Sequence, residues 1–272
     1  MLKKICSWII GVILTVLVLL IGIFAFWYFG STNYHLTGVP VLNYHQVNNK
    51  FNTVLTMKPA NFDEQMKYLH DNDYHSITLE QFDAYMRGEG DLPDRPVLIT
   101  FDDGYRSNYD LVYPILQEYG VKACISIIVL MPDLPTDNFC TWNQLREMTA
   151  SGLVEIGSHS YRLHNLGGDG GNFESGGANG VERRPNESDA GFQTRVLDDI
   201  QLSHDRIAGE LGGVTCFAYP FGCSDPDAKA LVDELFPVTL VTTPKCADLA
   251  KGLHDLPRFT VTMKTDLGKL VR

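Results

Sequence analysis

The sequence Val97-Leu98-Ile99-Thr100-Phe101-Asp102-Asp103-Gly104 joins a run of apolar and β-branched residues to two adjacent carboxylates and a glycine. Such a run is typical of a buried strand. Two neighbouring negative charges at the end of a buried strand are costly unless a cation or a proton compensates them. This stretch therefore predicts a buried strand of the fold and, at its end, a pair of carboxylates with a function.

A second predicted strand, Val154-Glu155-Ile156-Gly157-Ser158-His159, ends in a histidine and is followed by His164. One aspartate and two histidines form a plausible site for a divalent metal. Because a spacing of five suits one helix face less well than a spacing of four, we expect the histidines on a loop that curls around the ion. Taken singly, an Asp-Asp-Gly is usually an ordinary turn and each histidine a strand cap or a solvated residue. Together they favour a metal site.

The two carboxylates of the pair can have different roles at such a site. One binds the metal, while its neighbour points elsewhere and takes a proton from a water that the metal has made acidic. The sequence therefore favours hydrolytic chemistry near neutral pH.

The chain has 272 residues, of which 44% are hydrophobic, enough for one large domain or two small ones with a sizeable core. Its formal net charge of -11 argues against a nucleic-acid partner and against adhesion to anionic lipid surfaces.

The N-terminal segment is long and apolar, with no charged residue from Ile5 to Tyr34. At a rise of about 1.5 Å per residue, about 20 such residues span a bilayer core. Because Lys3 and Lys4 precede the segment, the first residues are expected in the cytoplasm and the rest outside. We therefore expect 1–35 to form a short cytoplasmic tail and a transmembrane anchor, and 36–272 a globular domain at the outer side of the cell membrane. A cleaved signal peptide is the alternative, although no clear small-x-small site follows the run.

Strand-like and helix-like segments alternate after this anchor. We expect strands at 39–44, from Val97 onward, and at 123–129, 154–157, 215–219, 238–242 and 258–262. Helices are expected at 61–70 with Asn61 as cap, after the capping boxes Thr78–Gln81 and Thr141–Gln144, at about 107–119 and 191–207, and near Ala228. The alternation predicts an α/β fold, a distorted (β/α) barrel of about seven strands, with an open doubly wound sheet as the alternative.

Polar or candidate site residues follow the predicted strands, which favours the barrel because these positions converge on its C-terminal face. They are His45, Asp102, Asp103, His159, Phe221 and Thr243. The glycine-rich segment 167–186 is too long and too polar for a simple turn. We expect it to be a surface loop near the site that contacts substrate.

Several of these motifs resemble those of one family, the polysaccharide deacetylases of carbohydrate esterase family 4. Thr100-Phe101-Asp102-Asp103-Gly104 and Ser158-His159-Ser160 match its first two motifs, and Tyr219-Pro220-Phe221-Gly222 is similar to its third. Val41-Leu42-Asn43-Tyr44-His45 is also family-like, so that the resemblance covers nearly all of 36–272. It implies a distorted (β/α) barrel and a metal-dependent removal of N-acetyl groups from N-acetylglucosamine-containing polysaccharide, with release of acetate.

The resemblance also implies roles for individual residues. Asp103, His159 and His164 would bind the divalent metal, most often zinc, with cobalt, nickel or iron as alternatives. Asp102 would be the general base, and the backbone N–H of Phe221 would help to hold the oxyanion. The histidine spacing of five is similar to the branch of the family that deacetylates poly-N-acetylglucosamine.

The chain departs from the family pattern in its later motifs. The third motif lacks the arginine that orients the base, and neither an Asp-x-Trp fourth motif nor a clear Leu-x-His fifth motif is present. Arg258 is the candidate to replace the missing polar contacts. His254 lies near the place expected for the general acid, with an ordinary surface position as the alternative.

Four further residues are expected to line the substrate site, namely His45, Tyr219, Pro220 and Gly222. For His45, a hydrogen bond to backbone is an equal alternative. The expected substrate is peptidoglycan or an exopolysaccharide at the cell surface.

Two other classes of protein fit part of the pattern. Two histidines and a carboxylate also form the facial triad of iron oxygenases, but that class does not explain the second aspartate. A membrane-tethered glycan-binding protein without catalysis would explain the missing later motifs, but it would not need the base.

Overall fold

The computed structural model describes residues 38–271, apart from 51–52, 165–179 and 223–224. The predicted anchor at 1–35 and most of the loop at 167–186 lie outside the described residues. Within the described ranges, no helix is both long enough and apolar enough to cross a bilayer.

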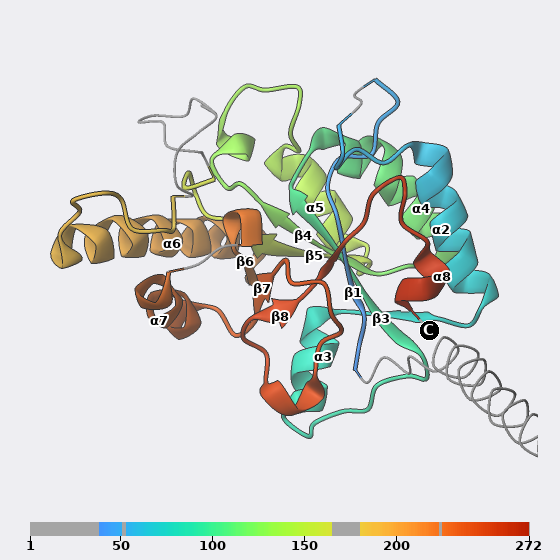
Figure 1. The fold of residues 1–272 in the computed structure, drawn as a ribbon. Helices are drawn as coiled ribbons and strands as arrows, with labels where there is room; N and C mark the ends of the chain where they lie inside the picture. Colours follow the sequence, from blue (N-terminus) through green and yellow to red (C-terminus); the bar gives the residue numbers. More distant parts are fainter. Residues whose placement is uncertain (1–37, 51–52, 165–179, 223–224, 272) are drawn as a thin grey trace, which may run out of the picture. The chain divides into compact units, whose positions relative to one another are not determined.

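A parallel sheet forms the centre of the domain (Figure 1). Its hydrogen-bonded path runs in the order β8-β7-β6-β5-β4-β3-β1-β9, and β2 pairs with β3 beside this path. The strands are β1 (Val41–Tyr44), β2 (His75–Ile77), β3 (Pro96–Asp103), β4 (Ala123–Ile127), β5 (Val154–Ser158), β6 (Phe217–Ala218), β7 (Thr239–Val241), β8 (Leu256–Pro257) and β9 (Phe259–Thr260).

The two edge strands of this path are neighbours in the sequence. β8 pairs with β7 and β9 pairs with β1, yet only Arg258 separates β8 from β9. The chain itself therefore joins the two ends of the sheet, and the eight strands of the path form a nearly closed barrel. This supports the predicted (β/α) barrel over the open doubly wound sheet.

The predicted number of strands was too low. β2 has only three residues, with His75 exposed and Ser76 half-buried, so it lacks the apolar run that predicts a strand. The strand predicted at 258–262 is shortened to β9, and β8 precedes it at Leu256–Pro257, because the chain changes partner from β7 to β1 at Arg258.

Helices cover the outside of the sheet (Figure 1). They are α2 (Pro59–Asp71), α3 (Leu79–Met86), α4 (Tyr113–Tyr119), α5 (Trp142–Ala150), α6 (Asp189–Leu211), α7 (Pro226–Leu235) and α8 (Leu267–Leu270). A π-helical turn (Asn108–Val112) leads into α4.

The capping boxes of α3 and α5 are confirmed, because Thr78 and Thr141 each exchange hydrogen bonds with the glutamine three residues later. The cap predicted at Asn61 was wrong. Pro59 is the first residue of α2, since the fixed φ of proline suits the first turn and its missing N–H is not needed there.

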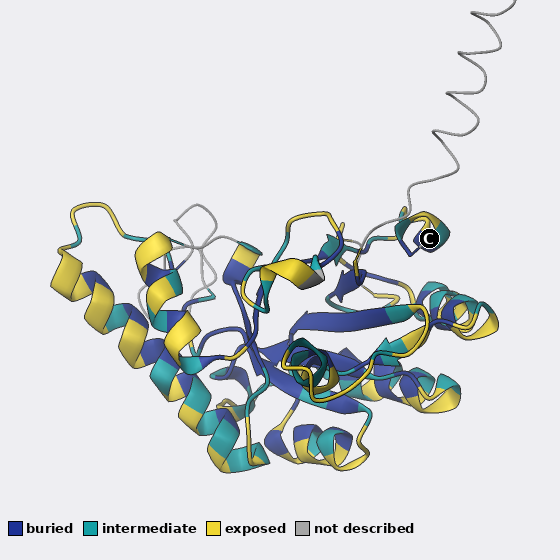
Figure 2. Ribbon diagram, turned by 90° about the horizontal axis from the view of Figure 1, so that it is seen from below, coloured by how far each residue is buried: buried dark blue, intermediate teal, exposed yellow. Residues whose placement is uncertain are grey.

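Successive side chains along the strands point alternately to the inside and the outside of the barrel, so the core has two parts. On β3, Leu98 belongs to the cluster that includes Val41, while Phe101 on the other face stacks on Tyr44 from β1. Figure 2 shows the strands buried and the helices buried along one side only. The inside is apolar near the start of β3 and becomes polar toward the carboxyl ends, where the site lies.

Candidate metal centre and active site

The end of β3 turns sharply at the two carboxylates. Asp103 has a φ of +74° and Gly104 a φ of +78°, a region that a residue with a side chain rarely adopts. A Cβ at Gly104 would also lie 2.7 Å from Cγ2 of Ile127, so that glycine is required there. The turn directs the neighbouring carboxylates to different partners, Asp103 toward the two histidines and Asp102 toward Arg258.

Asp103, His159 and His164 come together at the carboxyl end of the sheet. The Oδ1 atom of Asp103 lies 3.7 Å from Nε2 of His159 and 3.2 Å from Nε2 of His164. One candidate ligand atom from each residue fits within a span of 4.8 Å. The other ring nitrogen of His159, Nδ1, lies 2.7 Å from the carbonyl oxygen of Ala218, which assigns the proton to Nδ1 and leaves the lone pair of Nε2 facing Asp103.

The cluster contains a buried carboxylate oxygen, Oδ1 of Asp103, that makes no hydrogen bond with the described part of the chain. Burial raises the pKa of Asp103 to about 6, lowers that of His159 to about 3 and also lowers that of His164. Two neutral imidazoles and a carboxylate oxygen without a hydrogen-bond partner among the described residues are the donors that a divalent transition metal prefers, so the residues present fit such an ion.

The segment between the two histidines is a loop, as the spacing of five predicted. Ser160 has a φ of +70°, and its Oγ accepts a hydrogen bond from the N–H of Leu163 at 3.0 Å. The carboxylate of Asp199 on α6 accepts from the N–H groups of Tyr161 and Arg162 at 2.8 and 3.0 Å. The sequence analysis missed Asp199, whose only signal is a carboxylate among the apolar positions of a helix.

Asp102 faces the inside of the barrel and is 2% exposed. Nη1 and Nη2 of Arg258 donate to its two oxygens at 2.7 and 2.9 Å, and Nδ2 of Asn43 donates at 3.0 Å. Although burial alone would raise the pKa of Asp102, the positive charge of Arg258 and the hydrogen bonds that it donates hold this pKa well below its usual range. Arg258 therefore supplies the polar contact for which the sequence made it a candidate, and Asn43 adds a second one that the sequence analysis did not assign.

The turn at the end of β6 carries Phe221, the expected oxyanion donor, and two of the expected substrate residues, Pro220 and Gly222. Phe221 has a φ of +59° and is 44% exposed, and its ring stacks on His164 with centroids 4.7 Å apart. Pro220 is buried and Gly222 has a φ of +69°. Tyr219 does not join them, because its ring packs on Phe217 in the core cluster beneath α6 and α7.

The remaining two histidine candidates lie in different surroundings. His45 follows β1 and lies within electrostatic range of both Asp102 and Asp103, whose pKa values a positive charge on His45 would lower. His254 is 44% exposed, and its Nδ1 lies 2.9 Å from Oδ1 of Asp233 on α7. No contact among the described residues joins His254 to the cluster.

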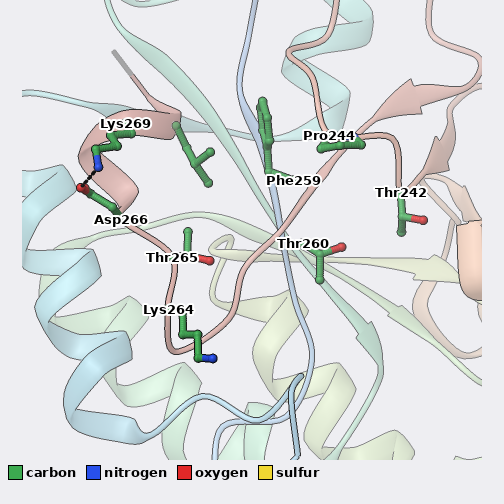
Figure 3. A pocket seen from close by; sticks show the side chains of 9 residues that line it. Thr242, Pro244, Phe259, Thr260, Lys264, Thr265, Asp266 and Lys269 are labelled. Atoms are coloured by element: carbon green, nitrogen blue, oxygen red, sulfur yellow. Dashed lines mark ion pairs between the residues drawn. The ribbon is translucent and has the colours of Figure 1, made fainter. Parts of the chain in front are cut away.

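A cleft of about 560 Å³ opens beside the seam between β8 and β9 (Figure 3). Thr242, on its wall, donates through Oγ1 to the carbonyl oxygen of Phe221 at 3.4 Å, so the cleft adjoins the turn after β6. It is lined by Thr242, Pro244, Phe259, Thr260, Lys264, Thr265, Asp266, Lys269 and Leu270. An aromatic ring among hydroxyl and charged groups is a lining that can accept a sugar.

Comparison of the sequence assigns the family. The chain matches the polysaccharide deacetylase family over residues 89–236, more than half of its length, and therefore belongs to that family. The predicted enzyme class, a hydrolase of carbon–nitrogen bonds other than peptide bonds, is confirmed with it.

Named relatives cover different shares of the chain. YxkH of Bacillus subtilis (strain 168) is 27% identical over 225 residues, which are 82% of this chain and 71% of that protein. The poly-beta-1,6-N-acetyl-D-glucosamine N-deacetylase of Escherichia coli (strain K12) is 31% identical over 142 residues, 47% of this chain. The aligned part is only 21% of the E. coli protein.

Solved structures share the fold. The deacetylase domain of BpsB from Bordetella bronchiseptica superimposes with a TM-score of 0.67 at 27% identity, over 82% of this chain and 95% of that one. A de-N-acetylase from Aggregatibacter actinomycetemcomitans gives a TM-score of 0.74 at 23% identity, over 85% and 99% of the two chains. At 23% identity, the similarity to the de-N-acetylase shows a shared fold only.

Proposed function

We propose that this chain hydrolyses N-acetyl groups of a cell-surface polymer of N-acetylglucosamine and releases acetate. The observation that carries the proposal is the pair of adjacent carboxylates with separate partners. Asp103 faces two histidines in a cluster that fits a cation, while Asp102 is held by Arg258. A site that only bound a glycan would not need the second carboxylate in its ionised form.

Asp103, His159 and His164 would hold the divalent metal, for which zinc is our first candidate and cobalt, nickel and iron are alternatives. A cation bound there supplies a Lewis acid that stabilises negative charge on an oxygen atom. The low pKa of Asp102 keeps it ionised, and Arg258 and Asn43 fix its orientation, so it can accept the proton of the attacking water.

The rest of the reaction requires an oxyanion donor and a proton for the leaving amine. We assign the first role to the backbone N–H of Phe221, which belongs to a turn stacked on His164. For the second role, Asp102 returns the proton it has accepted, since His254 lies at the surface with its Nδ1 2.9 Å from Oδ1 of Asp233. The balance is then one amide and one water converted into one acetate and one free amine.

Poly-β-1,6-N-acetylglucosamine is the substrate that we propose first, ahead of peptidoglycan. The E. coli and Staphylococcus aureus (strain N315) relatives named for this polymer are 31% and 34% identical to this chain over their aligned parts. The cleft beside Phe259 adjoins the turn after β6 and can accept further sugar units of a polymer. We also propose that the segment 1–35 anchors the enzyme in the cell membrane with residues 36–272 outside.

The test is acetate release by the full chain, purified in a mild detergent. Poly-β-1,6-N-acetylglucosamine oligomers, chitin oligomers and peptidoglycan are compared, with and without a chelator. We expect release that the chelator stops and that added Zn²⁺ restores. Asp103→Asn should lose both metal and activity, whereas Asp102→Asn should lose activity and keep the metal. No release from any polymer by a fully metal-loaded chain would refute the proposal and leave a glycan-binding protein.

A further inference from the structure

We propose that Asp199 on α6 is a positioning residue that holds the loop of His164 in the conformation needed to bind the cation. The inference rests on the proposed function, because it assigns Asp199 a role in assembling that same metal site. Asp199 would not touch the metal or the substrate, and it acts through the backbone of the loop.

The contacts of Asp199 are made with both of its oxygens. Oδ1 accepts from the N–H of Tyr161 at 2.8 Å, and Oδ2 accepts from the N–H of Arg162 at 3.0 Å. The two donors are consecutive and precede His164 by three and two residues. Asp199 is only 6% exposed, so water cannot replace it easily as an acceptor for these groups.

Other described contacts hold the beginning of the same loop. The N–H of Val129 and that of Leu130, which follow β4, donate to the carbonyl oxygens of Ser160 and Tyr161 at 3.0 Å each. Asp199 thus binds the loop from the side opposite to β4. With Asp199 removed, the N–H groups of Tyr161 and Arg162 would be left without an acceptor, and the loop would have to move to reach water.

Burying a carboxylate at position 199 costs free energy, which indicates that Asp199 has a role other than packing. The buried face of α6 is otherwise apolar or hydroxyl-bearing, with Phe192, Val196, Ile200 and Ser203. Burial raises the pKa of Asp199 to about 6, a sign that the ionised form is costly at this position. An apolar residue would pack α6 against the sheet without that cost, but it would leave the loop unheld.

The position of His164 depends on the conformation of the loop more than the position of His159 does. His159 directly follows β5, and its ring is fixed by the carbonyl oxygen of Ala218. His164 lies five residues further along, and its Nε2 reaches to 3.2 Å from Oδ1 of Asp103. A shift of the loop would therefore change the ligand geometry at His164 first and weaken the metal site.

The test compares Asp199→Asn with Asp198→Asn in the full chain in detergent. Asp198 is exposed on the same helix, so its variant makes the same change of charge without touching the loop. Zn²⁺ affinity is measured by calorimetry after the metal has been stripped, and the Co²⁺-loaded proteins are compared by their visible spectra. We expect Asp199→Asn to bind Zn²⁺ about 10- to 100-fold more weakly, as for other residues that orient metal ligands, and to change the Co²⁺ spectrum. Asp198→Asn should match the wild type.

Folding is followed separately by thermal melting in EDTA. Excess Zn²⁺ should restore the activity of Asp199→Asn, which a general loss of structure would not allow. If Asp199→Asn does not fold, Asp199→Glu keeps the carboxylate and is measured in the same way. An affinity within about twofold of the wild type and an unchanged Co²⁺ spectrum would overturn the inference. A wild-type chain that binds neither metal would overturn the proposed metal site, and the role of Asp199 with it.

Discussion

Arg258 donates from Nη1 and Nη2 to the two carboxylate oxygens of Asp102, at 2.7 and 2.9 Å. Arg258 is the single residue between the two edge strands of the sheet, whereas Asp102 lies at the end of a central strand. One ion pair therefore connects the seam of the barrel to the candidate base. The pair is also almost completely buried, with 0% of the Arg258 side chain and 3% of the Asp102 side chain exposed.

Replacing Arg258 should destabilise the fold strongly. In Arg258→Met, Asp102 would be left as a buried charge without its cation, a change that typically costs about 3–5 kcal/mol. The free energy of unfolding at pH 7 is to be measured by urea titration. Arg87→Met is the control, because Arg87 is 53% exposed in its ion pairs with Asp83 and Glu89 and should contribute less than about 1 kcal/mol. Equal effects of the two substitutions would contradict the structural role of the pair.

Metal binding should weaken in acid because of Asp103. Its pKa is raised to about 6 by burial, so below that pH a cation must displace a proton from the carboxyl group, whereas His159, with a pKa of about 3, is already neutral. We expect the apparent Zn²⁺ affinity to fall about tenfold per pH unit below pH 6 and to level off above it. Calorimetry in buffers of different ionisation enthalpy would show about one proton released at low pH and almost none above neutrality. An affinity that is flat across this range would contradict the prediction.

The parts of the fold that follow from local rules could be predicted from the sequence. Thr78 and Thr141 cap their helices because the reciprocal bonds with a glutamine three residues on need no distant partner. The end of β3 could also be predicted, since a buried run followed by Asp102 and Asp103 is typical of the end of a strand. The sequence also indicated that His159 and His164 lie on a loop.

Features set by distant segments could not be predicted. At Arg258 the chain passes from pairing with β7 to pairing with β1, because the sheet curves back on itself. No residue close to Arg258 in the sequence indicates this change of partner. Asn43 and Asp199 meet their partners 59 and 38 residues away in the sequence, so their roles follow only from the closed sheet and the packing of α6. Tyr219 was assigned to the site from its motif, but the strand alternation turns its ring toward Phe217 and the helices.

His254→Ala tests whether a general acid is needed at that position. Because His254 is 44% exposed and paired with Asp233, we expect kcat/KM for acetate release to stay within about twofold of the wild type, as for other surface substitutions. The contrasting variant is His164→Ala, which should lose metal and activity together. A loss of about 100-fold or more in His254→Ala, with the metal retained, would show that His254 is the general acid after all.

The packing inside the barrel should not tolerate a methyl group at Gly157, two residues before His159. A Cβ there would overlap Sγ of Cys216 and lie 3.1 Å from Oγ of Ser126. We expect Gly157→Ala to destabilise the fold by about 1–3 kcal/mol, the usual cost of overpacking a core. Cys216 is buried and forms no disulfide within the described part of the chain, with its Sγ 3.6 Å from Sγ of Cys124, so Cys216→Ala can open space for the methyl group. In urea unfolding, the double variant Gly157→Ala/Cys216→Ala should therefore be more stable than the sum of the two single changes predicts. Strict additivity would mean that the backbone, and not the Cys216 side chain, sets the limit at Gly157.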